Sequence, residues 1–226
     1  MTTPATPMFQ RTAVKPFYFN TSVHLGRITP YKATNIAELL NGLRHCPAES
    51  IFHHMFQTLE EHHFIPEGFS NDFAHWALSD CTEPALAELL AGVDVREFTC
   101  VGALRERAVQ IVEEFLKGNP GVGARPAQEA FYFCTAESEV LPTMFVAHTL
   151  GEFAEGIRRV SIHSIHHHFI EARLRIKLMS NDFSQWLHED VGLTEAARAL
   201  NRIDIYTATL AGIRTQIVHI LERALT

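Results

Sequence analysis

The chain has 226 residues, of which 46% are hydrophobic and 20% are charged, and its formal net charge is −7. This composition is ordinary for a globular protein with one large domain or two small ones. The acidic balance argues against a nucleic-acid partner, which requires a basic surface. The uninterrupted apolar stretches are far shorter than the roughly 18 residues of a membrane-spanning helix, so we expect no membrane partner either.

The N-terminal residues 1–16 are rich in Thr and Pro and lack the apolar core of a signal peptide. We therefore predict a flexible leader. The four cysteines form no Cys-x-x-Cys pair, which favours free thiols in a reducing compartment over a disulfide framework or a zinc knuckle. Together these features predict a cytoplasmic protein.

The chain contains an internal repeat. Residues 17–59 align with residues 131–173 at a constant offset of 114, and 13 of the 43 aligned positions are identical. Shorter matching blocks follow, at offsets of 110 and 109, and extend the repeat to the C-terminus. Two copies of one unit of roughly 100 residues therefore account for most of the chain, and a doubled fold often forms its site where the copies meet.

The elements of each copy follow one order. Phe-Tyr-Phe at residues 17–19 predicts a short extended segment, followed by a polar stretch whose turn residues are Gly26 and Pro30, with Pro142 in the second copy. Apolar residues at helical spacing then predict helices near residues 34–46, 47–59, 70–77, 84–90 and 96–116, with counterparts in the second copy. The fold class predicted is mainly α, as two tandem pseudo-symmetric helical repeats, each starting with a short β segment.

A Gly- and Pro-rich stretch separates the copies, because three glycines and two prolines in residues 117–126 cannot hold a helix. The predicted organisation is a leader (1–16), helical repeat 1 (17–116), a linker (117–130) and helical repeat 2 (131–226). We expect the two repeats to form one compact duplicated domain.

Histidines cluster on the second helix of each copy. In an α-helix, residues four apart share a face, so His163, His167 and Glu171 form one row, and His53 stands at the position of His167 in the first copy. A His and a carboxylate one turn apart can hold a divalent metal ion, which makes these four residues the candidate metal ligands. The alternative is that each histidine is half-buried and bonded to a neighbouring carbonyl or carboxylate.

The third helix of each copy opens with Ser-Asn-Asp-Phe. Its Asn71 and Asp72, and likewise Asn181 and Asp182, favour a helix cap with an acidic first turn. The same side chains could instead hold sugar hydroxyls or orient a histidine, with His54 and His168 as the histidines of such a site.

Two arginines, Arg44 and Arg158, close the first helix of the two copies. Compensation of the helix dipole explains both, and phosphate or carboxylate binding is the alternative. We include them among the candidate ligand-binding residues.

The combined motifs resemble an uncharacterised bacterial family, domain of unknown function family 5752. The resemblance rests on the paired Phe-Tyr-Phe segments, Ser50-Ile-Phe-His-His54 with Ser164-Ile-His-His-His168, and the two Asn-Asp-Phe-x-x-Trp blocks. It covers nearly the whole chain after residue 16. The resemblance implies motif boundaries and a tandem fold but no established activity.

The leading hypothesis for function is a small-molecule or metal-ion binding, or regulatory, module, with a histidine-containing site formed by the duplicated helices. One alternative is a metal-dependent enzyme that uses the His/Glu cluster of the second repeat, and another is a structural module for protein–protein interaction. The sequence leaves open whether the protein is an enzyme, whether a divalent metal ion is its cofactor, and whether it forms a homo-oligomer.

Overall fold

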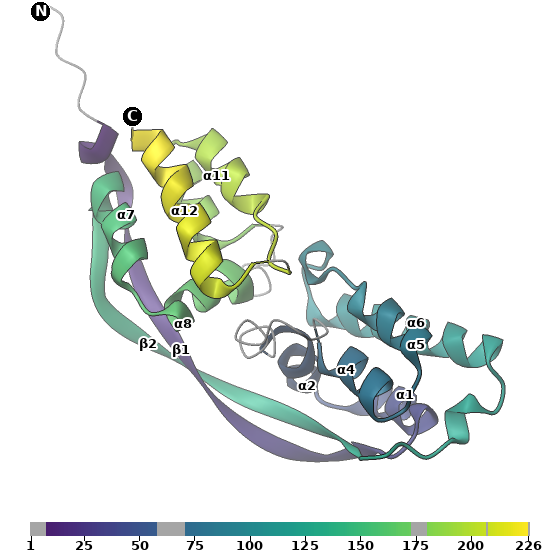
Figure 1. Ribbon diagram of the computed structural model, residues 1–226. Helices are drawn as coiled ribbons and strands as arrows, with labels where there is room; N and C mark the ends of the chain where they lie inside the picture. The colour runs from purple at the N-terminus through teal and green to yellow at the C-terminus, as the bar shows by residue number, and fades with distance from the viewer. Residues whose placement is uncertain (1–7, 58–70, 173–179, 207, 226) are drawn as a thin grey trace, which may run out of the picture. The chain divides into compact units, whose positions relative to one another are not determined.

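A computed structural model describes residues 8–57, 71–172, 180–206 and 208–225. Its two strands, β1 (Thr12–Ala33) and β2 (Phe131–Thr149), run side by side as a two-stranded sheet (Figure 1). The Thr135 hydroxyl donates to the carbonyl of Arg27 at 3.5 Å, and the Thr143 hydroxyl donates to that of Phe19 at 2.6 Å. From the first of these contacts to the second, the residue on β2 lies later in the sequence and its partner on β1 lies earlier. The two strands are therefore antiparallel.

Helices follow each strand. After β1 come α1 (Ile36–His45), α2 (Ala48–Phe52), the π-helix η2 (His53–Gln57), α4 (Asp72–Ser79), α5 (Pro84–Ala91) and α6 (Val101–Gly118). After β2 come α7 (Leu150–Arg159), α8 (Ile162–Ile165), the π-helix η5 (His166–Glu171), α10 (Asp182–Glu189), α11 (Thr194–Asn201) and α12 (Leu210–Leu225). Short 3₁₀ turns lie at η1 (Met8–Gln10), η3 (Val95–Glu97) and η4 (Val122–Ala124). No helix in the described ranges is both long and apolar enough to cross a bilayer.

The prediction of a mainly α fold with short extended segments was wrong, because β1 has 22 residues and β2 has 19. The fold is a mixed α+β fold. The residues predicted as turn residues, Gly26, Pro30 and Pro142, all lie inside the strands. A two-stranded sheet leaves one edge of each strand unpaired, and proline, which has no N–H to donate, is tolerated at such an edge.

The chain forms two compact units. Unit 1 combines residues Met1–Val23 with Glu139–Thr226, and unit 2 comprises His24–Ser138. Each unit therefore contains the Phe-Tyr-Phe segment of one sequence repeat and the helices of the other. The domain boundaries inferred from the repeat stay a prediction, since compactness does not test which segments fold on their own.

The Phe-Tyr-Phe segment packs in the same way in both units. In unit 1, Phe17 and Phe19 are buried while Tyr18 between them is 60% exposed, as the two-residue period of a strand requires. The ring of Phe19 lies against Gly156 of α7, where an added Cβ would come within 2.4 Å of a ring carbon. In unit 2, Phe133 lies against Gly42 of α1, and the corresponding distance is 2.3 Å. A residue without a side chain is needed at both helix positions because the ring occupies the space.

The second helix of each copy departs from the α-helix that we predicted. It begins as α2 or α8 and then widens into a π-helix, η2 or η5, at the histidines. The end of the predicted helix at residues 58–59 lies outside the described residues. A π-helix brings residues five apart, as well as residues four apart, onto one face, and this changes which side chains meet.

Candidate functional site

His168 joins the strand of unit 1 to its helices. Its Nε2 accepts a hydrogen bond from the backbone N–H of Asn20 at 2.8 Å, and its Nδ1 lies 2.7 Å from Oδ2 of Asp182. A nitrogen that accepts from an N–H must carry a lone pair, so the proton of a neutral ring is on Nδ1 and points to the carboxylate. We call this strand–His–Asp arrangement the histidine clamp.

Unit 2 contains the same clamp. His54 Nε2 accepts from the backbone N–H of Cys134 at 2.9 Å, and His54 Nδ1 lies 2.7 Å from Oδ2 of Asp72. Burial lowers the pKa of His54, although the hydrogen bond and the negative charge of Asp72 act in the opposite direction. The ring is therefore neutral near pH 7, as an accepting Nε2 requires.

The two asparagines predicted as ligand-binding residues act as helix caps. Asn71 accepts from the N–H of Ala74 and Asn181 from that of Ser184, each at 2.9 Å. Their amide groups differ in partner, because Asn71 donates to the carbonyl of Leu90 whereas Asn181 donates to the side chain of Asn201. The capping prediction is confirmed, and the aspartates that follow the caps orient the clamp histidines.

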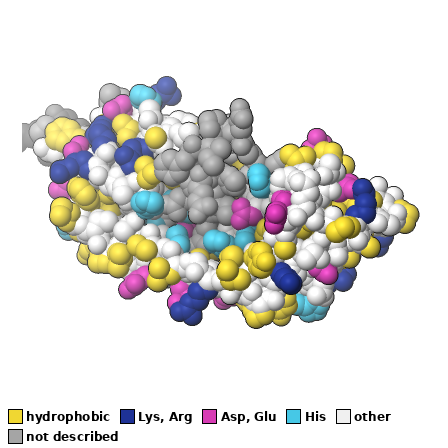
Figure 2. Space-filling model, turned by 60° about the horizontal axis from the view of Figure 1, so that its bottom comes forward, with side chains coloured by type: hydrophobic (Ala, Val, Ile, Leu, Met, Phe, Trp, Pro, Cys, Tyr) yellow, Lys and Arg dark blue, Asp and Glu magenta, His cyan; other side chains and the backbone are white. Residues whose placement is uncertain are grey.

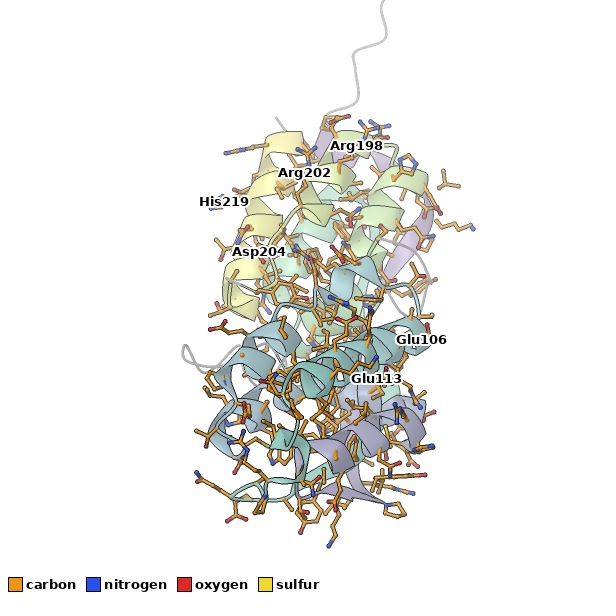
Figure 3. All side chains as sticks on the ribbon, turned by 90° about the vertical axis from the view of Figure 1, so that its right-hand side faces the viewer. Glu106, Glu113, Arg198, Arg202, Asp204 and His219 are labelled. Carbon is orange, nitrogen blue, oxygen red and sulfur yellow. The ribbon has the colours of Figure 1, made fainter. Side chains whose placement is uncertain are left out.

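The two arginines each reach a carboxylate on the last helix of their own unit. Arg44 of α1 pairs with Glu113 of α6, and Arg158 of α7 pairs with Glu222 of α12 at 3.0 Å. Glu113 is labelled on α6 in Figure 3. All four side chains are partly exposed, so these pairs hold helices together with a modest contribution to stability. Figure 2 shows that charged and hydrophobic side chains are interspersed over the face of the molecule in that view.

A buried cluster of two histidines and a carboxylate lies on η5 in unit 1. Nδ1 of His166 is 3.4 Å from Oε1 of Glu171, and Nδ1 of His167 is 3.2 Å from Oε2. The hydroxyl of Ser22 on β1 lies 3.3 Å from the same Oε2. His166 is 0% exposed, His167 3% and Glu171 7%. We call these three residues the η5 cluster.

The η5 cluster differs by one residue from the metal ligands that the sequence predicted. His167 and Glu171 lie together as expected, whereas the predicted third ligand, His163, is exposed on α8. The π-helix explains the substitution, because it places His166, five residues before Glu171, beside the carboxylate. Sequence reasoning missed His166 because it assumed the α-helical spacing.

The equivalent place in unit 2 has other side chains. The internal alignment puts Phe52 at the position of His166, Gln57 at that of Glu171 and Ala136 at that of Ser22. Phe52 and Ala136 help to line a pocket of about 450 Å³, together with two carboxylates, Glu49 and Glu137.

His53, the remaining predicted metal ligand, belongs to another group in unit 2. A ligand atom of His53, one of His54 and the thiol of Cys134 all lie within 4.8 Å of one another. Both ring nitrogens of His54 already serve the clamp, so a metal ion would have to displace one of those hydrogen bonds. Burial, followed by the charge of Asp72, raises the pKa of Cys134 and so disfavours the thiolate that binds metals.

Comparisons with known proteins identify relatives of the whole chain. A protein-family model described as a family of unknown function, DUF5752, matches residues 14–222. The chain is also similar to a solved structure titled "The structure of OrfY from Thermoproteus tenax", with 31% sequence identity and a TM-score of 0.82. That likeness covers 94% of this chain and 97% of the other. None of the curated proteins matches this chain.

Proposed function

The chain belongs to the family of unknown function DUF5752, and we propose that it is a metal-binding module that holds one divalent transition-metal ion at the η5 cluster. The protein ligands are His166, His167 and Glu171. This proposal is more specific than the family, which carries no established activity.

The observation that carries the proposal is the spacing of the ligand atoms. The two N···O separations are 3.2 and 3.4 Å, at or beyond the long end of the usual range for N–H···O hydrogen bonds. Two ligands that each lie about 2.0–2.1 Å from a tetrahedral ion are separated by roughly 3.3 Å. Each of the two His–Glu pairs therefore has the separation expected for two ligands of one tetrahedral ion.

Electrostatics support the same assignment. A buried carboxylate is costly unless a positive charge or several donors compensate it. Glu171 is 7% exposed, and two imidazole nitrogens and one hydroxyl oxygen lie within 3.4 Å of its oxygens. A divalent cation would compensate the charge and would bind the imidazoles in their neutral form, which is the form that ligates metals.

The nature and burial of the ligands favour binding over catalysis. Two imidazoles and one carboxylate suit zinc and its first-row neighbours rather than calcium or magnesium, which prefer oxygen. A catalytic metal needs an open position that substrate can reach, and all three ligands here are at most 7% exposed. A structural or regulatory ion fits this burial better.

The test is a zinc titration of the full-length protein in competition with a chromophoric chelator. We expect one tight equivalent in the wild type. In Glu171→Gln the affinity should fall by at least about 100-fold, since losing a ligand costs more than losing a residue that only supports one. The matched control is His163→Ala, which removes a neighbouring exposed histidine and should leave the affinity unchanged.

Two results would refute the proposal. One is that the wild-type protein takes neither zinc nor cobalt from the chelator. The other is a binding site that survives Glu171→Gln but is lost in His163→Ala, because that pattern would restore the α-helical ligand set and exclude His166.

A further inference from the structure

A second candidate site lies in unit 1, away from the histidines. A pocket of about 340 Å³ opens between α10 and α11, a volume within the range of small-molecule sites. Its lining is rich in hydroxyl and amide groups, among them Ser180, Ser184, Thr194 and Asn201. Arg198 of α11, labelled in Figure 3, also lines it.

One of these groups is buried without a hydrogen bond. Ser184 is 1% exposed, and its Oγ has no hydrogen-bond partner among the described residues. Burying a hydroxyl in this state is unfavourable. Because Ser184 lines the pocket, a ligand that carries a donor or an acceptor would satisfy it.

The polar lining is not needed to pack the two helices. Unit 2 packs the equivalent pair, α4 and α5, and the internal alignment gives Ala74 for Ser184, Leu78 for His188, Pro84 for Thr194 and Ala91 for Asn201. Asn71, the cap of α4, donates its amide N–H to the backbone carbonyl of Leu90. Asn181, the cap of α10, donates instead to the side-chain oxygen of Asn201. The helix pair therefore packs without these four polar side chains, and their presence in unit 1 needs another explanation.

The charged groups at the pocket already have partners within the protein. Arg198 pairs with Glu195 at 2.6 Å, and Glu189 accepts from the amide of Gln185 at 3.2 Å. The neutral groups are bonded to one another, His188 to Thr194 and Asn201 to Ser180, but hydroxyl and amide groups can each make further hydrogen bonds. They match a molecule whose own groups are hydroxyls, since each hydroxyl both donates and accepts. We propose that this pocket binds a small, neutral, polyhydroxylated molecule.

The experiment is a titration of full-length, isotopically labelled protein with three neutral polyols, glucose, inositol and glycerol, followed by backbone NMR shifts. At least one polyol should shift resonances of α10 and α11, with saturation. Ser184→Ala should weaken that binding by about fivefold to tenfold, the effect of one hydrogen bond. The same variant should be at least as stable as the wild type, because it removes a buried hydroxyl that has no hydrogen-bond partner. Unit 2 already has an alanine, Ala74, at the equivalent position.

Three controls keep the result specific. Ser79→Ala makes the same chemical change on the surface of unit 2 and should not alter binding. The double variant His166→Phe/Glu171→Gln removes the η5 cluster and should also retain polyol binding, so failure of the metal proposal and failure of this one are distinguishable. A second pocket variant, His188→Leu, should weaken binding if Ser184→Ala proves unstable.

The proposal is overturned if none of the three polyols causes saturable shifts in α10 or α11. Binding that neither Ser184→Ala nor His188→Leu weakens would overturn it as well. Saturable binding of inorganic phosphate or glycine at this pocket, without binding of any polyol, would show that the ligand is charged and would refute the neutral class.

Discussion

Units 1 and 2 share one clamp but differ in what surrounds it. In both, a buried histidine joins a strand N–H to an aspartate at the start of a helix, with nearly identical distances. Around it, unit 1 carries His166 and Glu171 where unit 2 carries Phe52 and Gln57. The clamp, which both units share, is what the fold requires of each copy. The residues that differ between the units are the ones that can serve a particular function.

The second difference points the same way. The α10–α11 pair of unit 1 carries a polar pocket, and four of its polar residues are replaced in α4 and α5 by Ala74, Leu78, Pro84 and Ala91. Both candidate sites therefore belong to unit 1. On the two proposals made above, the binding chemistry lies in unit 1, at positions where unit 2 has other side chains.

The largest expected effect tests which strand segment stabilises which unit. Phe19→Ala should destabilise the protein by about 3–5 kcal/mol, the usual cost of removing a buried phenylalanine side chain. By hydrogen exchange, the loss of protection should be greater in α7 and α10 than in α1 and α4, because Phe19 packs in unit 1.

Its counterpart, Phe133→Ala, should reverse the pattern and affect α1 and α4 more. If each variant instead exposed the helices of its own sequence repeat, the assignment of strand segments to the two units would be incorrect.

The clamp itself gives the next effect. Asp182→Ala and Asp72→Ala should each cost roughly 1.5–3 kcal/mol, because each leaves a buried Nδ1–H without its charged acceptor. The loss should be greater for Asp182, whose side chain is 17% exposed against 28% for Asp72. Urea unfolding measures both values, and a cost near that of an ordinary surface substitution would contradict the clamp.

The two packing glycines test the contact between strand and helix in each unit. Gly42→Ala and Gly156→Ala should each destabilise by about 1–3 kcal/mol, since the new methyl group would overlap a phenylalanine ring. The sign is diagnostic, because Gly→Ala inside an unobstructed helix stabilises by roughly 0.5–1 kcal/mol. Thermal unfolding of both variants would reveal an increase in stability if the rings lay elsewhere.

The smallest effect concerns pH. Burial lowers the folded-state pKa of His54 below its ordinary value of 6.5, so the unfolded chain takes up the proton first as the pH falls. The stability that the neutral ring contributes is present above about pH 6.5 and is lost as the pH falls through the folded pKa. The free energy of unfolding should therefore depend less steeply on pH in His54→Gln than in the wild type between about pH 7 and 5. Equal slopes would indicate that His54 is not held neutral.

The sequence predicted those parts of the structure that depend on local signals. The Asn71 and Asn181 caps and much of the helix spacing could be predicted, because caps and apolar periodicity act over a few residues. The strands were predicted too short, since exposed polar residues and prolines are also typical of turns and only the partner strand identifies them as sheet.

The candidate site was predictable in residue type but not in partners. Asp72 and Asp182 were expected in the acidic first turn of a helix, with sugar binding or the orientation of a histidine as the alternatives. Their carboxylates lie 2.7 Å from His54 and His168. The clamp depends on backbone groups of Asn20 and Cys134, which no side-chain pattern reveals. The choice of His166 over His163 depends on a π-helix, which has no recognisable signal in the sequence.

Metal content measures the central claim most directly. The protein would be purified untagged and without chelators, and its metals quantified by elemental mass spectrometry beside His166→Phe/Glu171→Gln, which gives the η5 cluster the residues of unit 2. The account predicts close to one equivalent of a divalent transition metal in the wild type and none in the variant. No metal in either protein, or the same content in both, would contradict it.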